Sequence, residues 1–587
     1  MDKFAAAIGY KASGLSFILY KMPESAKYLT FGVPKASGGM RTIHAPTEKL
    51  KRLQGRLASV LLECNSEIHE KNPLPPLSHG FEKGRSIFTN AWEHKSRRYV
   101  LNIDIENFFP TINFGRIRGF FISNKDYALP AKAATLVAQI ACFQGKLPQG
   151  SPCSPIVANL IAHLLDVRMV RLAKARTCTY SRYADDLTFS TNQKHFPSAI
   201  AEELTGYPGS WVLSDDLLNE VARTGFSVNH CKTRMQLRSS RQMVTGLTVN
   251  EKVNISADYY RKARKMCSSL FNHGHYYTEL AAPLAPTLTV LGAAAAPLTS
   301  APKFIEATAP LEGILSHIYY VKHLQSVKSE PDNEVRKAKG NNKVKYPAYR
   351  NMYKKFLYFR HFINPNEPLI VCEGKTDNIY LRSALKALDP AYPQLAEVKG
   401  GKLFTKIRLL KHSRTEHDIL ELSGGSGNIA NFIAHYKSAV FNYKFRPMKF
   451  PIIVLVDNDS GQLGSVFAQA NKLIKTGGPI GFTTINDFYH LCHNLYLIKT
   501  PEIGTAGESC MEDLFEASVL ATTLDGKAFN PKDDKDTATQ YGKFVFADKV
   551  VRPNYDKINF SQFAVILNRI LAVMTHYSAN KPRAATP

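Results

Sequence analysis

Two apolar segments that carry acids decide the fold of the N-terminal half: YVLNIDIENFFP at residues 99–110 and SRYADDLTFS at residues 181–190. Both read as strands, with Asp104 near the end of the first and Asp185 and Asp186 in a turn within the second. Three carboxylates that converge repel one another unless cations offset them, and hard oxygen ligands suit Mg²⁺. The pattern therefore predicts a two-magnesium site for phosphoryl transfer.

The residues around this pair separate it from a chance pair of acids. Asp215 and Asp216 are also adjacent, and we interpret them only as the start of a solvated helix. In contrast, YADD at 183–186 and DIENFFP at 104–110 resemble the signature motifs of reverse transcriptases. That resemblance implies that Asp104, Asp185 and Asp186 are the catalytic, metal-binding acids.

The same resemblance implies a set of nucleotide-binding residues. Phe109 would lie beneath the incoming sugar and exclude a 2′-hydroxyl, so that deoxynucleoside triphosphates are the substrates; plain core packing is the alternative for this ring. LPQGSPCSP at 147–155 resembles the loop that lies against nucleotide and template, and the segments GGMRTIHAP and VNHCKTR supply two cations that would offset phosphate charge. The positions carried over are Phe109, Gln149, Gly150, Arg41 and Lys232.

Two short elements that flank these motifs resemble retron reverse transcriptases in particular. One is the NAxxH element in FTNAWEHK, and the other is the VTG element in RQMVTGLTVN. The resemblance implies that they recognise a structured RNA, whereas His94 alone could be a buried histidine and residues 245–246 a simple hairpin turn. The RNA-binding residues implied are Asn90, His94, Val244, Thr245 and Gly246.

The retron resemblance covers roughly residues 1–360 and implies an α+β right-hand polymerase with fingers, palm and helical thumb. It also implies an RNA-directed DNA polymerase that copies its cognate noncoding RNA into branched, multicopy single-stranded DNA (msDNA) and stays bound to it as a ribonucleoprotein. Retrons generally act in antiphage defence. A group II intron-type reverse transcriptase is the alternative, but no HNH-like cluster accompanies these motifs.

A second set of acids follows two short apolar runs in the C-terminal half. LIVCEGKTD places Glu373 and Asp377 after the first run, and PIIVLVDND places Asp457 and Asp459 after the second. Short apolar runs that alternate with helix-like segments predict an α/β unit with a mainly parallel sheet. Acids two apart at a strand end can face one ion beyond the carboxyl edge of that sheet, which predicts a second Mg²⁺ or Mn²⁺ site.

This arrangement resembles the TOPRIM domain, and the EGxxD form looks most like its nuclease branch. The resemblance makes Glu373, Asp377, Asp457 and Asp459 the catalytic and metal-binding acids, with Glu512 or Asp513 in SCMEDLF as a weaker candidate. It implies a toxic nuclease held in check by the RNA–DNA complex, as in a toxin–antitoxin pair. The alternatives are an exposed acid cluster without function and a non-catalytic nucleic-acid-binding module.

Composition agrees with a nucleic-acid partner and with more than one domain. The chain has 587 residues and a formal charge of +26, an excess that favours a polyanion. None of the nine cysteines shows zinc-ribbon or thioredoxin spacing. No signal peptide and no membrane span are expected, so the prediction is a cytoplasmic protein without a membrane partner, for which a homo-oligomer within the ribonucleoprotein is one option.

Stretches rich in small residues, proline or charge predict the domain boundaries. We expect fingers and palm over 1–255, a thumb over 256–362, a TOPRIM domain over 363–545 and a C-terminal extension over 546–587. The thumb would include an Ala/Pro-rich segment at 281–302 and a basic linker at 326–347. A glycine-rich stretch, ELSGGSGNIANF at 421–432, lacks the GK[ST] of a phosphate-binding Walker motif and is interpreted as a turn before a helix.

Overall fold

The computed structural model describes residues 1–34, 39–71, 77–277, 304–329, 346–411, 418–422, 425–474, 478–503, 507–532, 536 and 538–581. The Ala/Pro-rich segment and residues 330–345 of the basic linker lie outside the described residues. The chain divides into two compact units, residues 1–257 with 320–334, and residues 258–319 with 335–587. The segment expected as a separate thumb, 256–362, is thus divided between the two units.

Unit 1 is built on a four-stranded antiparallel sheet with the strand order β4-β5-β3-β8. The strands are β3 (Tyr99–Ile105), β4 (Thr179–Tyr183), β5 (Asp186–Thr191) and β8 (Val228–Leu237). Strand β3 lies between β5 and β8, and five of its seven residues are buried. The edge strand β8 buries one of its ten residues. Strand β3 pairs with β5 so that Asp104 lies opposite Asp186.

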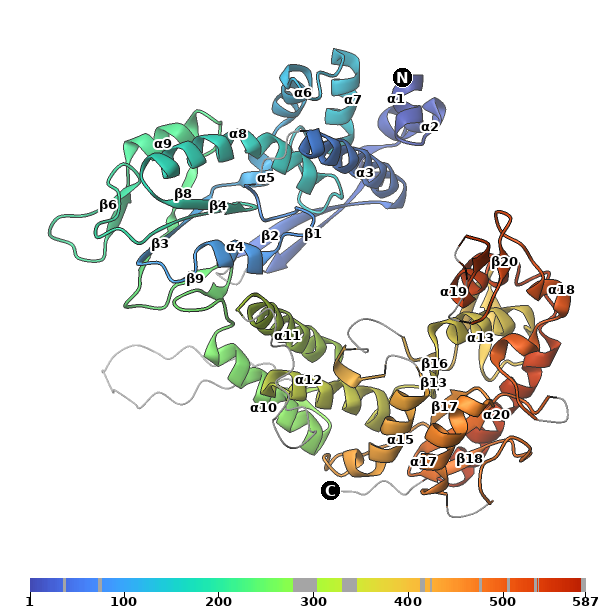
Figure 1. Ribbon diagram of the computed structural model, residues 1–587. Coiled ribbons are helices and arrows are strands. Elements are labelled where there is room, and N and C mark those ends of the chain that lie inside the picture. The colour runs from blue at the N-terminus through green and yellow to red at the C-terminus, as the bar shows by residue number, and fades with distance from the viewer. Residues whose placement is uncertain are drawn as a thin grey trace. The chain divides into compact units, whose positions relative to one another are not determined.

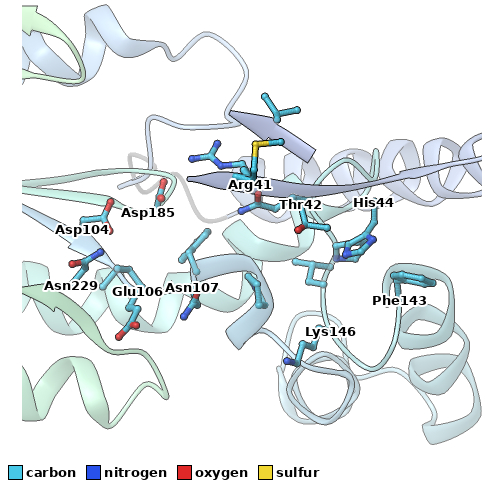
Figure 2. Close-up of a pocket in the computed structure, with 18 of the residues that line it drawn as sticks. Arg41, Thr42, His44, Asp104, Glu106, Asn107, Phe143, Lys146, Asp185 and Asn229 are labelled. Carbon is cyan, nitrogen blue, oxygen red and sulfur yellow. The ribbon is translucent and has the colours of Figure 1, made fainter. Parts of the chain in front are cut away.

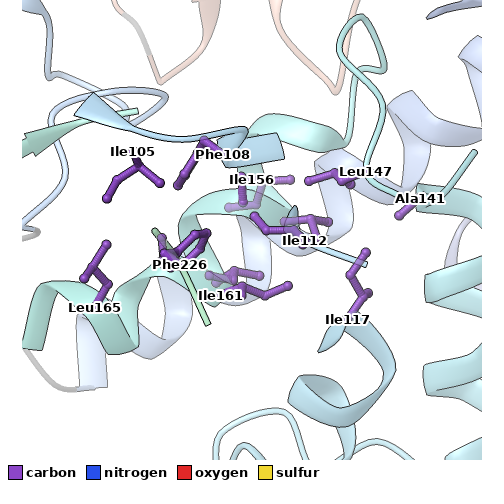
Figure 3. Packing of buried hydrophobic residues seen from close by; sticks show 14 of the residues in the cluster. Ile105, Phe108, Ile112, Ile117, Ala141, Leu147, Ile156, Ile161, Leu165 and Phe226 are labelled. Atoms are coloured by element: carbon purple, nitrogen blue, oxygen red, sulfur yellow. The ribbon is translucent and has the colours of Figure 1, made fainter. Parts of the chain in front are cut away.

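Helices cover one face of this sheet and form the main core of unit 1 (Figure 1). The 22-residue helix α8 starts with Pro155 in its first turn and buries residues on several sides. Figure 3 shows Ile105, at the end of β3, and Phe108, in α5, packed towards Ile156 and Phe226. The helices of this part are α1 (Asp2–Ala7), α2 (Ala12–Ser16), α3 (Glu48–Lys71), α4 (Ile87–Glu93), α5 (Phe108–Thr111), α6 (Phe114–Ser123), α7 (Ala131–Ala141), α8 (Ser154–Ala175) and α9 (Asp215–Ala222).

Three small antiparallel hairpins complete unit 1. The first, β1–β2, has seven residues in each strand and exposes Leu29, Phe31 and Val33 on one face. The second lies between β5 and β8, and the third follows β8. Their strands are β1 (Tyr28–Pro34), β2 (Met40–Pro46), β6 (Ala201–Glu203), β7 (Trp211–Leu213), β9 (Met243–Val244) and β10 (Leu247–Thr248).

Unit 2 contains a five-stranded sheet with the order β16-β13-β17-β19-β18. Its strands are β13 (Leu369–Cys372), β16 (Arg408–Leu409), β17 (Ile452–Val456), β18 (Tyr489–Cys492) and β19 (Leu495–Lys499). Three of the four strand pairs are parallel, and only the edge strand β18 is antiparallel. Every residue of β13, β17 and β19 is buried, as expected for parallel strands covered on both faces.

The register of this sheet brings two strand ends together. Cys372, the last residue of β13, pairs with Leu455 near the end of β17. The chain therefore leaves both strands at the same carboxyl edge, immediately before Glu373 and Asp457. This edge is where ligands bind in open parallel sheets.

The described chain has further helices and short two-stranded ribbons, and one helix, α11 (Ala309–Ser329), crosses from unit 2 into unit 1 at residue 320. The core joins sheet residues to α13, α20 and the aromatic segment that follows residue 540. Within the described residues no helix is long and apolar enough to cross a membrane. The helices are α10 (Ala257–His273), α11 (Ala309–Ser329), α12 (Ala348–Tyr358), α13 (Lys375–Ala387), α15 (Ser426–Val440), α16 (Ser460–Gln462), α17 (Ala468–Asn471), α18 (Ala517–Leu520), α19 (Lys543–Val545) and α20 (Ala564–Ala579). The short strands are β11 (Tyr276–Tyr277), β12 (Phe304–Ile305), β14 (Ala396–Lys399), β15 (Lys402–Thr405), β20 (Ala528–Phe529) and β21 (Gln540–Tyr541).

Candidate active sites

The three acids of unit 1 meet at one end of its sheet. Asp104 is paired across the strands with Asp186, and the backbone N–H of Ile105 donates to the carbonyl of Asp185 at 2.9 Å. Ala184, in the turn, has a φ of 55°, a left-handed conformation that orients the two following acids. Partial desolvation and the charges of Asp185 and Asp104 raise the pKa of Asp186 to about 6. Desolvation also raises the pKa of Asp185.

A lysine offsets part of this negative charge. The Lys232 ammonium donates to Asp104 Oδ2 at 2.8 Å, although 128 residues separate them in the chain. This hydrogen bond raises the pKa of Lys232, with further contributions from the charges of Asp104, Asp185 and Asp186. The charges of the three acids therefore all act on Lys232, whose ammonium group lies beside them.

A cavity of about 820 Å³ opens beside these acids. Its lining joins Asp104 and Asp185 to Arg41, Gln149 and Lys232. Figure 2 shows Arg41 reaching from β2 towards the side on which Asp104 and Asp185 lie. A concave site of this volume with cations and carboxylates on its walls has the size and chemistry for a polyanionic small molecule with bound cations.

The loop predicted to lie against the nucleotide packs on the first hairpin. The backbone N–H of His44 donates to the carbonyl of Gln149 at 3.0 Å. Gly150 has a φ of +117°, and a Cβ there would lie 2.9 Å from the His44 carbonyl oxygen. Only glycine fits this close approach, so the loop can line the cavity directly.

Phe109 packs among other aromatic rings close to this cavity. It is half-buried in α5, with its ring centroid 5.4 Å from that of Phe108 and 6.3 Å from that of Phe81. Phe108 and Pro110 line the cavity, whereas Phe109 is not among its lining residues. The role of a sugar gate for Phe109 therefore remains a prediction that depends on a bound nucleotide.

The NAxxH element lies inside the protein. Asn90 and His94 are both 0% exposed. Ser181 in β4 donates to Asn90 Oδ1 at 2.6 Å, and His94 is 2.7 Å from both Ser181 Oγ and Ser190 Oγ. Because the Ser181 hydrogen goes to Asn90, His94 Nε2 must donate to Ser181, and Nδ1 accepts from Ser190. Burial lowers the pKa of His94 to about 3, so the ring is neutral.

The expectation of direct RNA contact therefore differs from the structure at these positions. A side chain without exposed surface cannot touch RNA while unit 1 stays folded. Instead His94 ties together Ser181 and Ser190, which lie in the two strands on either side of the YADD turn. Its place is that of a positioning residue for Asp185 and Asp186.

The VTG element contacts α4, the helix that contains most of the NAxxH element. Val244 is 0% exposed, and Thr245 Oγ1 donates to the carbonyl of Ile87 in α4 at 3.1 Å. Gly246 is exposed and has a φ of 80°. Of the five residues expected to contact RNA, Gly246 is exposed and Thr245 is partly exposed, whereas the other three are buried. Sequence alone could not show this, since the two elements are joined by a contact across 158 residues.

The other face of the catalytic hairpin is held by a buried ion pair. Arg182 and Asp166 have side-chain exposures of 0% and 2%, and Arg182 binds both carboxylate oxygens at 2.7 Å. The same guanidinium donates to the Ala184 carbonyl within the turn at 3.1 Å. A bidentate pair of this kind fixes orientation as well as position. The sequence analysis did not identify Arg182, although it stands next to YADD.

In unit 2, three of the predicted acids act on one another electrostatically at the carboxyl edge of the sheet. Asp457 Oδ1 accepts from the Met511 backbone N–H at 3.1 Å, and Gln462 Nε2 donates to Glu373 Oε2 at 2.8 Å. Asp377 Oδ2 accepts from the Gly374 N–H at 2.8 Å at the start of α13. The predicted Glu373, Asp377 and Asp457 thus lie together.

Burial and mutual repulsion perturb these acids strongly. Burial, with the charges of Glu512 and Glu373, raises the pKa of Asp377 to about 7 despite its backbone hydrogen bond. Burial and the charges of Asp377, Glu512 and Glu373 raise the pKa of Asp457 to about 8. Carboxyl groups with pKa values near 7 or 8 would lose their protons more readily beside a cation, so the site favours one.

Of the two adjacent acids Glu512 and Asp513, Glu512 is the one that belongs to this cluster. Glu512 is 3% exposed, accepts from Tyr380 Oη at 3.1 Å and from Lys543 Nζ at 3.0 Å. Asp513 is exposed, and its carboxylate accepts from the Cys510 N–H at 2.7 Å as a helix cap. Lys543 and Gln462 were missed from the sequence, because only the fold brings them to the acids.

The surroundings of Asp459 show whether the acid cluster of unit 2 has an oxygen free to bind a cation. Its Oδ1 is buried and has no hydrogen-bond partner within the described residues. Its charge, after burial, is the next cause of the raised pKa of Glu373. An unpartnered carboxylate oxygen beside other acids suits Mg²⁺ or Mn²⁺. In the described parts of the chain no group of three or more aspartate, glutamate, histidine or cysteine side chains is arranged to hold a metal ion as it stands, so binding would require these side chains to move towards the ion.

Two other sequence features are peripheral to these sites. Asp215 and Asp216 occupy the exposed first turn of α9, as expected for a solvated helix start. The glycine-rich stretch leads through Gly425, with a φ of 85°, into α15, and residues 423–424 lie outside the described residues. Neither feature joins an acid cluster.

Sequence comparison finds a known family that is similar to most of unit 1. Residues 33–249 match the model of the family described as reverse transcriptase (RNA-dependent DNA polymerase). This range contains the three acids of unit 1 and the cavity beside them. By sequence, the N-terminal part of the chain therefore has the character of a reverse transcriptase domain.

The individual relatives belong to retrons. The chain is 37% identical over 282 residues to the retron Mx65 reverse transcriptase of Myxococcus xanthus, covering 45% of this chain and 61% of the relative. It is 35% identical over 234 residues to the retron Ec86 reverse transcriptase of Escherichia coli, covering 40% and 66%. The chain thus spans about three fifths of the length of these relatives.

Among solved structures, apo telomerase from Candida tropicalis truncated from its C-terminal domain is 14% identical. The match covers 40% of this chain and 56% of that one, with a TM-score of 0.27, and a likeness of this size carries no argument.

Proposed function

We propose that unit 1 is an RNA-directed DNA polymerase that uses Asp104, Asp185 and Asp186 as its metal-binding acids. The observation that carries the proposal is the cross-strand pairing of Asp104 with Asp186 beside a cavity of about 820 Å³. Mg²⁺ bound by these acids would stabilise the attacking and leaving oxygens of phosphoryl transfer. The family match at 33–249 supports this assignment.

The residues around the acids divide the remaining work. Lys232 and Arg41 would offset the charge of a deoxynucleoside triphosphate, and the backbone of Gln149 and Gly150 would support the nucleotide and template. Phe109 would exclude a 2′-hydroxyl when a nucleotide is bound. Primer extension on an RNA template by the purified full chain tests this: deoxynucleotides should be incorporated with Mg²⁺, and no incorporation would refute the proposal.

We further propose that the template is a cognate structured noncoding RNA and the product is branched RNA–DNA. Similarity to two retron enzymes supports it. Nucleic acid extracted from expressing cells should contain a species that a 2′,5′-debranching enzyme separates into RNA and single-stranded DNA. A linear cDNA without a branch would favour the group II intron-type alternative.

For unit 2, we propose a metal-dependent nuclease that resembles TOPRIM enzymes and acts as the effector of the complex. The supporting observation is the coupled set of Glu373, Asp377, Asp457 and Glu512 at the carboxyl edge of a parallel sheet. A cation there would offset the charge of a scissile phosphate, and Lys543 would balance Glu512. We place this activity in antiphage defence, restrained by the RNA–DNA until infection disturbs it.

A non-catalytic binding module is the second candidate for unit 2, because Asp377 and Glu512 also make ordinary structural hydrogen bonds. Protein freed of its RNA–DNA separates the two. Cleavage of DNA or RNA with Mg²⁺ or Mn²⁺ that is lost in Asp457→Asn supports the nuclease. Binding without cleavage under both metals supports the module.

A further inference from the structure

An exposed aromatic ring follows a lysine that contacts the acid cluster of unit 2. Phe544 is 48% exposed and follows Lys543, whose ammonium contacts Glu512 Oε2 at 3.0 Å. The Lys375 ammonium lies 4.6 Å from the centroid of the Phe544 ring. Lys375 is the first residue of α13 and follows Glu373 by two positions. Both flanks of Phe544 are thus tied to the acids.

The core does not account for this ring. Two residues further on, Phe546 is 0% exposed and stacks on Phe529 at 4.3 Å between centroids. Phe546 therefore anchors the segment in the core, whereas Phe544 remains exposed on it. Single exposed apolar residues are common on protein surfaces, so its position beside a phosphoryl-transfer site is what distinguishes this one.

We propose that Phe544 and Lys375 form a subsite for one unpaired nucleobase and its neighbouring phosphate, so that the substrate of unit 2 is a single-stranded nucleic acid. An aromatic face accepts any base by stacking, and a nearby ammonium tracks the backbone. Base pairing would bury the face that the ring needs, which disfavours intact duplex. The inference rests on the proposed nuclease function and adds its substrate class.

The chain contains a matched control for this pair. Phe441 is 64% exposed, and the Arg446 guanidinium lies 5.6 Å from its ring centroid. Its ring is also 6.0 Å from that of His493, just before β19, whose first residue pairs with the first residue of β17. Phe441 is therefore at the amino edge of the sheet, opposite the acids.

The experiment uses the full chain, freed of its RNA–DNA, and single-stranded DNA oligonucleotides with one 2-aminopurine at successive positions. Without divalent metal, so that nothing is cleaved, fluorescence quenching reports stacking. We expect one position whose quenching persists in Phe544→Trp and Phe441→Ala and is lost in Phe544→Ala. Single-strand affinity should fall roughly 5- to 150-fold in Phe544→Ala, the range that stacking of one base supplies.

The phosphate contact has its own readout. In Lys375→Ala, the slope of log affinity against log salt should decrease by about one unit for the single strand, since one cation fewer neutralises the backbone. Lys399→Ala, which removes another exposed lysine of unit 2, should leave the Phe544-dependent quenching in place. Thermal melting of each variant shows that it is folded.

The outcomes separate this inference from the nuclease proposal. If wild type cleaves and Phe544→Ala shows unchanged quenching and cleavage, the subsite is refuted and the nuclease stands. If wild type never cleaves yet Phe544-dependent quenching is present, the subsite stands and the nuclease is refuted. Equal affinity for blunt duplex and single strand would refute the single-strand assignment.

Discussion

The two acid clusters of this chain solve the same electrostatic problem in different ways. In unit 1 the acids border a cavity of about 820 Å³, and Lys232 already lies on Asp104. In unit 2 the acids are more deeply buried, and the pKa of Asp457 rises to about 8, against about 6 for Asp186. An open cluster suits a site that must admit a large substrate, whereas a buried one depends more on its cation to remain charged.

The largest expected effect comes from removing two acids of the unit 1 cluster. Asp185→Asn with Asp186→Asn should reduce primer extension by at least about 10³-fold, because two groups that stabilise charge in the transition state are lost. Steady-state extension with Mg²⁺ measures this. Asp215→Asn with Asp216→Asn removes an equal charge from the exposed helix α9 and should leave extension unchanged. An equal loss in both double variants would contradict the assignment.

Next in size is the contrast between neighbouring acids in unit 2. Glu512→Gln should reduce metal-dependent cleavage about 10²-fold or more, since Glu512 contacts Lys543 and its charge acts on Asp377 and Asp457. Asp513→Asn should change cleavage little and cost about 1 kcal/mol of unfolding free energy as a weakened cap. Cleavage rates and denaturant titrations on the same preparations check both. The idea fails if Asp513→Asn is the more damaging change.

A third effect concerns the positioning of the unit 1 acids. His94→Ala leaves Ser181 and Ser190 without their shared partner inside the palm, which should cost about 2–4 kcal/mol of unfolding free energy and slow extension. Lys95→Ala, at the next and partly exposed residue, should do neither. Direct RNA recognition by His94 would instead show as weaker RNA binding at unchanged stability.

The smallest effect is a dependence of stability on pH that only the buried cluster should show strongly. The pKa of Asp457 is about 8 in the fold, above its ordinary value near 3.8, so its stabilising contribution is present below about pH 4 and is lost as pH rises through about 8. Without metal, the Tm of wild type should therefore fall towards pH 8 more than that of Asp457→Asn. Added Mg²⁺ should raise the wild-type Tm most at high pH. A pH-independent difference between the two proteins would contradict the raised pKa.

The spacing of acids after apolar runs was enough to predict which carboxylates lie at strand ends, because strand periodicity is local. Glu373, Asp377 and Asp457 lie together at such an edge, and Asp104 lies opposite Asp186. The RNA-contact expectation for the NAxxH element differed because burial depends on how distant segments pack. A three-residue match cannot show that Ser181 and Ser190 enclose His94.

Partners that come from distant parts of the chain also escaped the sequence. Lys543 reaches Glu512 across 31 residues, and Arg182 pairs with Asp166 through the packing of β4 on α8. Local patterns carry no information about such contacts. The choice between Glu512 and Asp513 needed the fold for the same reason, since adjacent acids in a short helix face different surroundings.

The most direct test of the account is to map where a divalent metal binds. Fe²⁺ in place of Mg²⁺, with ascorbate and peroxide, cleaves the backbone near its binding site. We predict cuts near residues 104 and 183–186 that excess Mg²⁺ suppresses and that disappear when Asp185 and Asp186 are changed to Asn. Cuts that leave these segments intact, or that persist in the double variant, would contradict the claim that the three acids of the palm gather the catalytic metal ions.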